Sequence, residues 1–232
     1  MGISHFVHLH GDPTHAAALC NKAQTALGLL AGALPKGAAA LLHAPLAVPG
    51  RDPLPVAQDA RMLLCQLYFE HDDALESGTL SARIAECFSR LRASEGVRDV
   101  HSHVMTTEHL KPGNPNEPDA PADAVSFFVQ YDGPAKDPAA FHAYYRAHHV
   151  PIVFRMPGIR SVAYHLPTPI AGPVVGTSVA RLQIVQAVFS SAEDFLNMRQ
   201  SAERQEGLRD FANYPPFEGP VTHQVMQSRR LG

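Results

Sequence analysis

The chain has 232 residues, of which 45% are hydrophobic and 18% charged, as expected for a globular protein with a buried core. Its formal net charge is −3 and no run of Lys or Arg occurs, which argues against nucleic acid and anionic membrane surfaces as partners. No apolar stretch reaches the roughly 18 residues of a membrane-spanning helix, and the N-terminus lacks a signal-peptide pattern. We therefore expect a cytoplasmic protein with no membrane partner.

The first half of the chain predicts six elements in the order strand, helix, strand, strand, helix, strand. The strands are indicated by polar–apolar alternation or by short apolar runs, and the helices by Ala-rich and Leu-rich segments with apolar residues about every 3.6 positions. The predicted strands span 5–10, 38–47, 61–69 and 97–105, and the predicted helices span 14–33 and 72–93.

The second half predicts the same order of elements. Its first strand is rich in aromatic and β-branched residues, and its first helix ends near a proline. The predicted strands span 125–131, 159–166, 180–189 and 220–227, and the predicted helices span 137–155 and 191–204.

Short sequence matches relate the two halves at a nearly constant offset, which indicates an internal repeat. The matching pairs are Ser4 and Ser126, His43 and His165, Arg61 and Arg181, and Met105 and Met226, spaced 120 to 122 residues apart. The sequence therefore predicts one unit at 1–108 and a second at 125–232. Residues 109–124 hold four prolines and predict an extended linker.

The repeated order βαββαβ is that of the ferredoxin-like unit, whose antiparallel sheet carries helices on one face. The other face must be covered, and the second copy is the natural cover. We therefore predict an α+β barrel with two antiparallel sheets face to face, formed by a monomeric pseudo-dimer. A homodimer is the alternative assembly.

A spaced pattern of aromatic, histidine and proline residues lies in the second half: Phe141, Tyr145, His149, Pro151 and Pro157-Gly158. This pattern resembles the EthD family of the dimeric α+β barrel superfamily, and residues 210–226 resemble that family's last helix and strand. The chain departs from the family at two positions, because Tyr145 replaces a usual Trp and His148 replaces an apolar residue. The first half lacks the motif, so the resemblance implies a site in the C-terminal half.

The superfamily includes cofactor-free monooxygenases, lactone isomerases, polyketide cyclases, decarboxylases and haem proteins. The resemblance and the surplus of histidines favour an enzyme without a cofactor that acts by acid–base chemistry on a small aromatic, polyketide-like or lactone substrate. We expect a lyase or isomerase that works by proton transfer, decarboxylation or C–C cleavage. Two alternatives stay open: a cofactor-free monooxygenase, and a non-catalytic accessory protein that binds haem or a hydrophobic metabolite.

Helical spacing places five residues of the motif helix on the side that meets the sheet: Phe141, Tyr145, His148, His149 and Ile152. Pro151 can kink the helix and open space beside His149. The candidate catalytic residues are His149, His148, His165 and Tyr145. The candidate substrate-binding residues are Phe141, Tyr144, Ile152, Tyr164, Tyr214, His223 and Phe128.

Two of these histidines also have structural interpretations. His149 can be a core histidine that bonds a carbonyl group, and His165 matches His43, so its recurrence can reflect the fold alone. Strand alternation places His165 and Tyr164 on opposite faces of their sheet.

A second group of histidines lies in the first half, at His8, His10, His101 and His103. The first and fourth strands of a ferredoxin-like sheet are neighbours, so the four imidazoles can cluster, and imidazole suits several transition metals. The sequence does not fix the register between the strands, so an ordinary polar patch is favoured and no metal is predicted. No phosphate-binding glycine loop occurs, and we expect no nucleotide cofactor.

Overall fold

A computed structural model describes residues 1–50, 61–71, 75, 77–110, 123–173 and 175–231. The first half contains β1 (Gly2–Gly11), α1 (Ala16–Ala31), β2 (Ala39–Pro45), β3 (Arg61–Phe69), α3 (Gly78–Arg92) and β4 (Val97–Leu110). The second half contains β5 (Val125–Tyr131), α4 (Pro138–Tyr144), the π-helical turn η2 (Tyr145–His149), α5 (Val150–Arg155), β6 (Ile159–Pro167), β7 (Thr177–Ser178), β8 (Gln183–Phe189), α6 (Ala192–Arg199), α7 (Ala202–Phe211) and β9 (Val221–Leu231).

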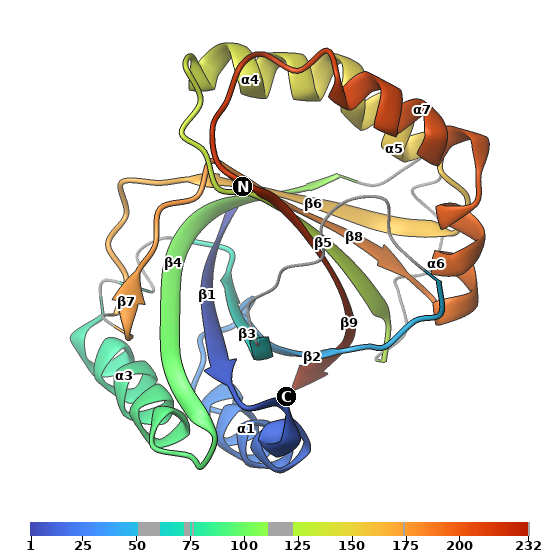
Figure 1. Ribbon diagram of the computed structural model, residues 1–232. Coiled ribbons are helices and arrows are strands. Elements are labelled where there is room, and N and C mark those ends of the chain that lie inside the picture. Colours follow the sequence, from blue (N-terminus) through green and yellow to red (C-terminus); the bar gives the residue numbers. More distant parts are fainter. Residues whose placement is uncertain (51–60, 72–74, 76, 111–122, 174, 232) are drawn as a thin grey trace.

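The strands form one closed antiparallel barrel. One wall has the order β4-β1-β3-β2 and the other has the order β9-β5-β8-β6. The walls join where β2 pairs with β9 and where β4 pairs with β6. The predicted α+β barrel is confirmed, and the two predicted sheets are opposite walls of one ring (Figure 1).

Two boundaries differ from the predicted ones for local reasons. The predicted helix at 191–204 is two helices, because Ser201 starts a new one by accepting a hydrogen bond of 3.1 Å from the backbone N–H of Arg204. Strand β4 continues to Leu110 because its last residues pair with β6. Most of the predicted linker, 111–122, lies outside the described residues, as do 72–74 and 76 of the second predicted helix.

Each strand divides its side chains between a helix layer and the barrel interior. Helices α1 and α3 cover one wall, and α4 to α7 cover the other (Figure 1). Two apolar cores lie between helices and sheet, one in each half. The interior holds a smaller apolar cluster made of Phe6, Leu64, Met105, Phe128, Ile184 and Met226.

Polar side chains inside the barrel bond the halves to each other across both seams. His43 of β2 shares a hydrogen bond of 2.7 Å with Ser228 of β9. His165 of β6 shares a similar bond of 2.9 Å with Thr107 of β4. His43 and His165 are repeat partners, so each half contributes one histidine to a seam. This accounts for the recurrence of His-x-Pro by hydrogen bonding between the halves.

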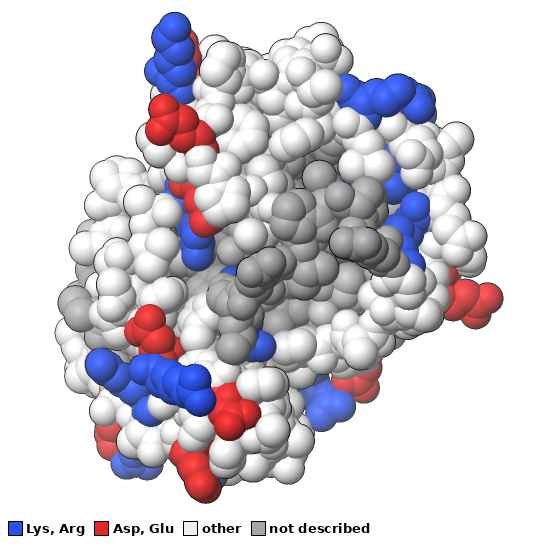
Figure 2. All heavy atoms as spheres, in the orientation of Figure 1, with Lys and Arg blue, Asp and Glu red and all other residues white. Residues whose placement is uncertain are grey.

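Among the described residues on the face seen in Figure 2, basic and acidic side chains are interspersed. None of the helices in the described part of the chain is long and apolar enough to cross a membrane.

Candidate functional site

The EthD-like motif forms an interrupted helix over the second wall. Asp137 caps α4 by accepting a hydrogen bond of 2.9 Å from the backbone N–H of Ala140. The helix then widens to a π turn, in which the N–H of Val150 donates to the carbonyl of Tyr145, five residues back. Pro151 follows at once and has no N–H, so it cannot restore the regular pattern at that point. Single π turns inside helices often occur at functional sites.

The π turn decides which motif side chains reach the sheet. Phe141, Tyr145, His149 and Ile152 are buried, as predicted. The prediction that His148 also faces the sheet is wrong, because His148 is exposed and stacks on Tyr144 with 4.4 Å between ring centroids. The π turn is wider than an α-helical turn, so Tyr145 and His149, four positions apart, lie on the same side of the helix. His148 is rotated outward.

His149 is oriented by a carboxylate. Its Nδ1–H donates to Oδ2 of Asp210 on α7 over 2.9 Å, and Oδ1 of the same carboxylate accepts the Tyr144 hydroxyl at 2.9 Å. This bond fixes the tautomer and leaves Nε2 of His149 with its lone pair. Burial lowers the pKa of His149, although the bond to Asp210 opposes the shift. The imidazole is therefore neutral near pH 7 and able to accept a proton.

His149 lines a small cavity between the helices and the sheet, with a volume of 40 Å³. Its walls include the aromatic rings of Phe127, Tyr131, Tyr145 and Phe211. The present space holds only a few water molecules. A ring-sized ligand therefore requires α7 or the side chains to move.

A buried positive charge lies in the same cavity. Arg204 of α7 is only 7% exposed, and its guanidinium lies 5.7 Å from the centroid of the Phe127 ring. Buried guanidinium groups favour a nearby anion because the surroundings screen charge weakly. The cavity thus combines a neutral base with a group suited to a developing oxyanion.

Gly207 lets α7 approach His149. A side chain added at this position would meet the Cε of Met156 at 3.3 Å and the Cε1 of His149 at 3.4 Å. These contacts are tight, and Asp210 sits one turn further along the same helix. The missing side chain therefore helps to bring the carboxylate within hydrogen-bond reach of the imidazole.

A cluster of tyrosines supports the cavity. Tyr145 stacks on Tyr164 with 5.5 Å between centroids, and Tyr131 stacks on Tyr214 at 6.2 Å. Burial raises the pKa of Tyr131 to about 12 and raises the pKa of Tyr145 and Tyr164 as well. All of these hydroxyls stay protonated at neutral pH and act only as hydrogen-bond donors or neutral acceptors.

The predicted site residues divide between two places. Tyr145, His149, Tyr214 and His223 belong to the helix layer, where the ring of His223 packs on Phe127 at 4.9 Å. His165 and Phe128 lie inside the barrel, on the other face of the sheet. The structure therefore does not bring His165 to His149, and burial lowers the pKa of His165 to about 3.

The four histidines of the first half do come together. Strands β1 and β4 pair so that His8 stands opposite His101, and the ring centroids of His8 and His103 are 4.9 Å apart. His10 and His101 are 4.8 Å apart. Within the described residues, no group of three or more His, Cys, Asp or Glu side chains is arranged to hold a metal ion.

Sequence reasoning missed Asp210, Arg204 and Gly207, all on α7. The second predicted helix of this half ends at 204, and residues 210–226 enter the prediction only through their resemblance to the EthD family's last helix and strand. A spacing of three and then four residues from Gly207 to Asp210 and Tyr214 is the pattern of one helix face, and it was the available signal.

Comparison with known protein families relates part of the second half to one family. The EthD domain model matches residues 133–214, which include η2 and α7. Among curated proteins, no sequence matches this chain.

Several solved structures are similar over nearly the whole chain. A "putative monooxygenase" from Fusobacterium nucleatum subsp. nucleatum ATCC 25586 is 9% identical, with a TM-score of 0.64 and coverage of 100% of this chain and 94% of that chain. An anthrone oxidase-like protein is 13% identical, with a TM-score of 0.60 and coverage of 100% and 93%. A "putative monooxygenase" from Lactobacillus acidophilus NCFM is 10% identical, with a TM-score of 0.58 and coverage of 99% and 95%. At these identities the likeness shows the fold alone.

Proposed function

Because the EthD domain model matches residues 133–214, we propose that the chain is an enzyme whose reaction takes place beside His149. In this proposal, His149 removes a proton from a small aromatic carbon acid, and the resulting carbanion reacts directly with O₂. The observation that carries the proposal is the 2.9 Å bond between His149 and Asp210 at the edge of a buried aromatic cavity that also contains Arg204.

The proton-transfer step rests on three groups. Asp210 holds the imidazole in one tautomer and stabilises the cation that forms when Nε2 takes a proton. Arg204 stabilises the negative charge that moves onto an oxygen of the substrate, as in an enolate or a phenolate. The aromatic walls hold a planar ring and keep water away from the carbanion.

The oxidation step needs no further oxidant than O₂. A methylene group beside a carbonyl loses one proton to His149, the carbanion adds O₂ to give a peroxide anion, and His149 returns the proton to the terminal oxygen to give a hydroperoxide. Loss of water from the peroxide leaves a ketone, so one CH₂ and one O₂ become one C=O and one H₂O. The fold shared with proteins named as monooxygenases and as anthrone oxidase-like supports this oxidoreductase reaction over the lyase or isomerase reaction expected from the sequence.

The test is oxygen consumption with anthrone and related aromatic ketones as substrates. The proposal predicts uptake of one O₂ per ketone formed by the purified protein, and no turnover under nitrogen. Conversion of the substrate at the same rate without O₂ would point to the lyase or isomerase instead. A visible absorption band in a protein that converts none of these substrates would favour the haem-binding accessory protein.

A further inference from the structure

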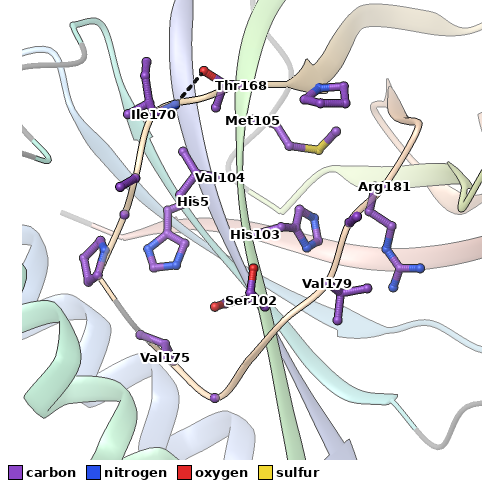
Figure 3. A pocket seen from close by; sticks show the side chains of 17 residues that line it. His5, Ser102, His103, Val104, Met105, Thr168, Ile170, Val175, Val179 and Arg181 are labelled. Carbon is purple, nitrogen blue, oxygen red and sulfur yellow. Dashed lines mark hydrogen bonds between the residues drawn. The ribbon is translucent and has the colours of Figure 1, made fainter. Parts of the chain in front are cut away.

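A second and larger cavity, of 440 Å³, lies beside β4, and the chemistry at His149 does not use it. Its lining includes His5, Ser102–Met105 and most residues of the segments 167–173 and 175–181 (Figure 3). Strand β4 pairs with β6 only as far as Met105, and with β7 only at His101 and Ser102. Between these two ladders, the described strands pair His103 and Val104 with β1 alone. The wall of the barrel therefore has an opening beside His103 and Val104, here called the window.

Two polar side chains face the cavity from the barrel side. His103 and Arg181 lie on the opposite side of β4 from His5 in Figure 3. His103 is 7% exposed, and neither of its ring nitrogens has a hydrogen-bond partner among the described residues. His8 lies behind His103, with 4.9 Å between the two ring centroids, and is fully buried. Both ring nitrogens of His8 also lack a hydrogen-bond partner among the described residues. Buried polar atoms are nearly always satisfied, so these four nitrogens indicate an occupant that supplies partners.

The charge of the surroundings favours an anion. The side chain of Arg181 is 9% exposed and pairs with Asp132, whose own side chain is more open to solvent. Arg61, the repeat partner of Arg181, is buried across the barrel and donates to the side chains of Gln224 and Gln130. Both guanidinium groups lie close enough to lower the pKa of His8, after the larger effect of burial. A cation would be repelled here, whereas an oxyanion would be attracted.

The site also reflects the internal repeat. His8 and Gln130 are repeat partners, and so are His103 and Gln224. The first half supplies imidazoles where the second supplies amides, around the two matched arginines. The side chains of His8, His103, Gln130 and Gln224 can all donate hydrogen bonds to oxygen atoms. The donors therefore converge inside the barrel from both halves.

We propose that the window admits a small oxyanion, a phosphate or a carboxylate, which binds His103 and Arg181, with His8 and Arg61 behind them. Arginine suits phosphate and carboxylate alike, because two N–H groups of its planar guanidinium can donate to two oxygens of either group. The site is separate from the pocket of His149, because it lies on the other face of the sheet. The binding does not depend on the proposed oxidation.

Calorimetric titration of the full-length protein at pH 7 tests this site. Sodium phosphate and sodium acetate are the two probes, and sodium chloride at equal ionic strength is the blank. We expect saturable binding of at least one oxyanion with a dissociation constant of about 1 mM or lower. The probe that binds more tightly tells a phosphate site from a carboxylate site.

Variants connect the binding to these residues. His103→Phe keeps a ring against Phe6, which lies 5.3 Å away, and Arg181→Gln removes the charge. Each change should weaken binding at least about tenfold. The control is Arg155→Gln, an exposed arginine paired with Glu206 on the far helix layer, which should bind as the wild type does.

Three results would overturn the proposal. One is the absence of saturable binding of both probes by the wild type. Another is unchanged affinity in folded His103→Phe and Arg181→Gln variants. If these variants do not fold, a crystal of the wild type soaked in phosphate and in acetate decides, because water alone between His103 and Arg181 contradicts the site.

Discussion

The cavity beside His149 and the interior of the barrel use opposite faces of the same strands, and they treat the internal repeat differently. The interior keeps matched polar residues in both halves, such as His43 and His165 at the seams. The helix layer does not. Leu19, Ala23 and Leu27, which stand 122 positions before Phe141, Tyr145 and His149, are buried apolar residues of α1.

This difference shows how one unit can lack the proposed site and still fold. A helix layer needs only apolar side chains that fill its space, so an alanine and a leucine can stand where the other half has a tyrosine and a histidine. The interior has less freedom because its polar groups bond across the seams, and loss of one partner leaves another unsatisfied. The role of a histidine in this chain therefore depends on the face of the sheet to which it belongs.

Acidification should destabilise the fold through the histidines inside the barrel. Burial lowers the pKa of His43 to about 4 and of His165 to about 3. Below pH 6.5 these histidines are protonated in the unfolded chain but stay neutral in the folded chain. The full stability is therefore present above pH 6.5 and is lost as the pH falls toward 4. The two histidines together cost on the order of 3 kcal/mol per pH unit. Urea unfolding at pH 7.5 and pH 5.5 measures the loss, and an equal free energy of unfolding at both would contradict these assignments.

Asp210→Asn should disable the helix-layer site without unfolding the protein. An amide at this position no longer fixes the imidazole tautomer or stabilises its cation, so kcat should fall by about 10²-fold or more. Glu206→Gln is the matched control, because its carboxylate is on the same helix but pairs with the exposed Arg155. Steady-state rates of both variants test this, and equal rates would remove Asp210 from the mechanism.

His43→Leu and His165→Leu form a matched pair at the two seams. Each should lower the free energy of unfolding by about 1–3 kcal/mol, because a buried hydroxyl loses its partner. Their effects should be similar, and turnover per folded molecule should stay at the wild-type level. Loss of turnover in the His165 variant alone would restore His165 as a catalytic residue.

Gly207→Ala tests the close approach of α7 to His149. The added methyl meets two side chains at 3.3 and 3.4 Å, so the helix must shift by a few tenths of an ångström. Overpacking of this kind costs about 1 kcal/mol or more, although alanine favours the helix by a similar amount. The net stability should change little, whereas kcat should fall as Asp210 moves from His149. A variant with wild-type kcat would show that this approach is not needed.

The sequence was sufficient for the architecture but not for the site. The offsets between Ser4 and Ser126 and between Met105 and Met226 predict two copies of one unit, and the closed barrel follows from the need to cover both sheets. Strand alternation correctly separates His165 from Tyr164. The apolar spacing of the motif helix likewise finds Phe141.

The parts that sequence reasoning missed depend on deviations from regular geometry. A regular helix turns His148 toward the sheet, and only the π turn before Pro151 turns it away. The start of α7 at Ser201 also interrupts the predicted helix. The new helix, α7, carries Asp210 to His149. The π turn has no strong local sequence signal, whereas the start of α7 has one in the capping residue Ser201.

The central claim is that His149, and not its neighbour, carries the proton. His149→Gln and His148→Gln make the same change at adjacent positions, one buried against Asp210 and one exposed. Measured as kcat/KM with the substrate found by oxygen uptake, the first should lose about 10²-fold or more and the second less than about twofold. Equal activity of the two folded variants, or a larger loss at His148, would contradict the assignment.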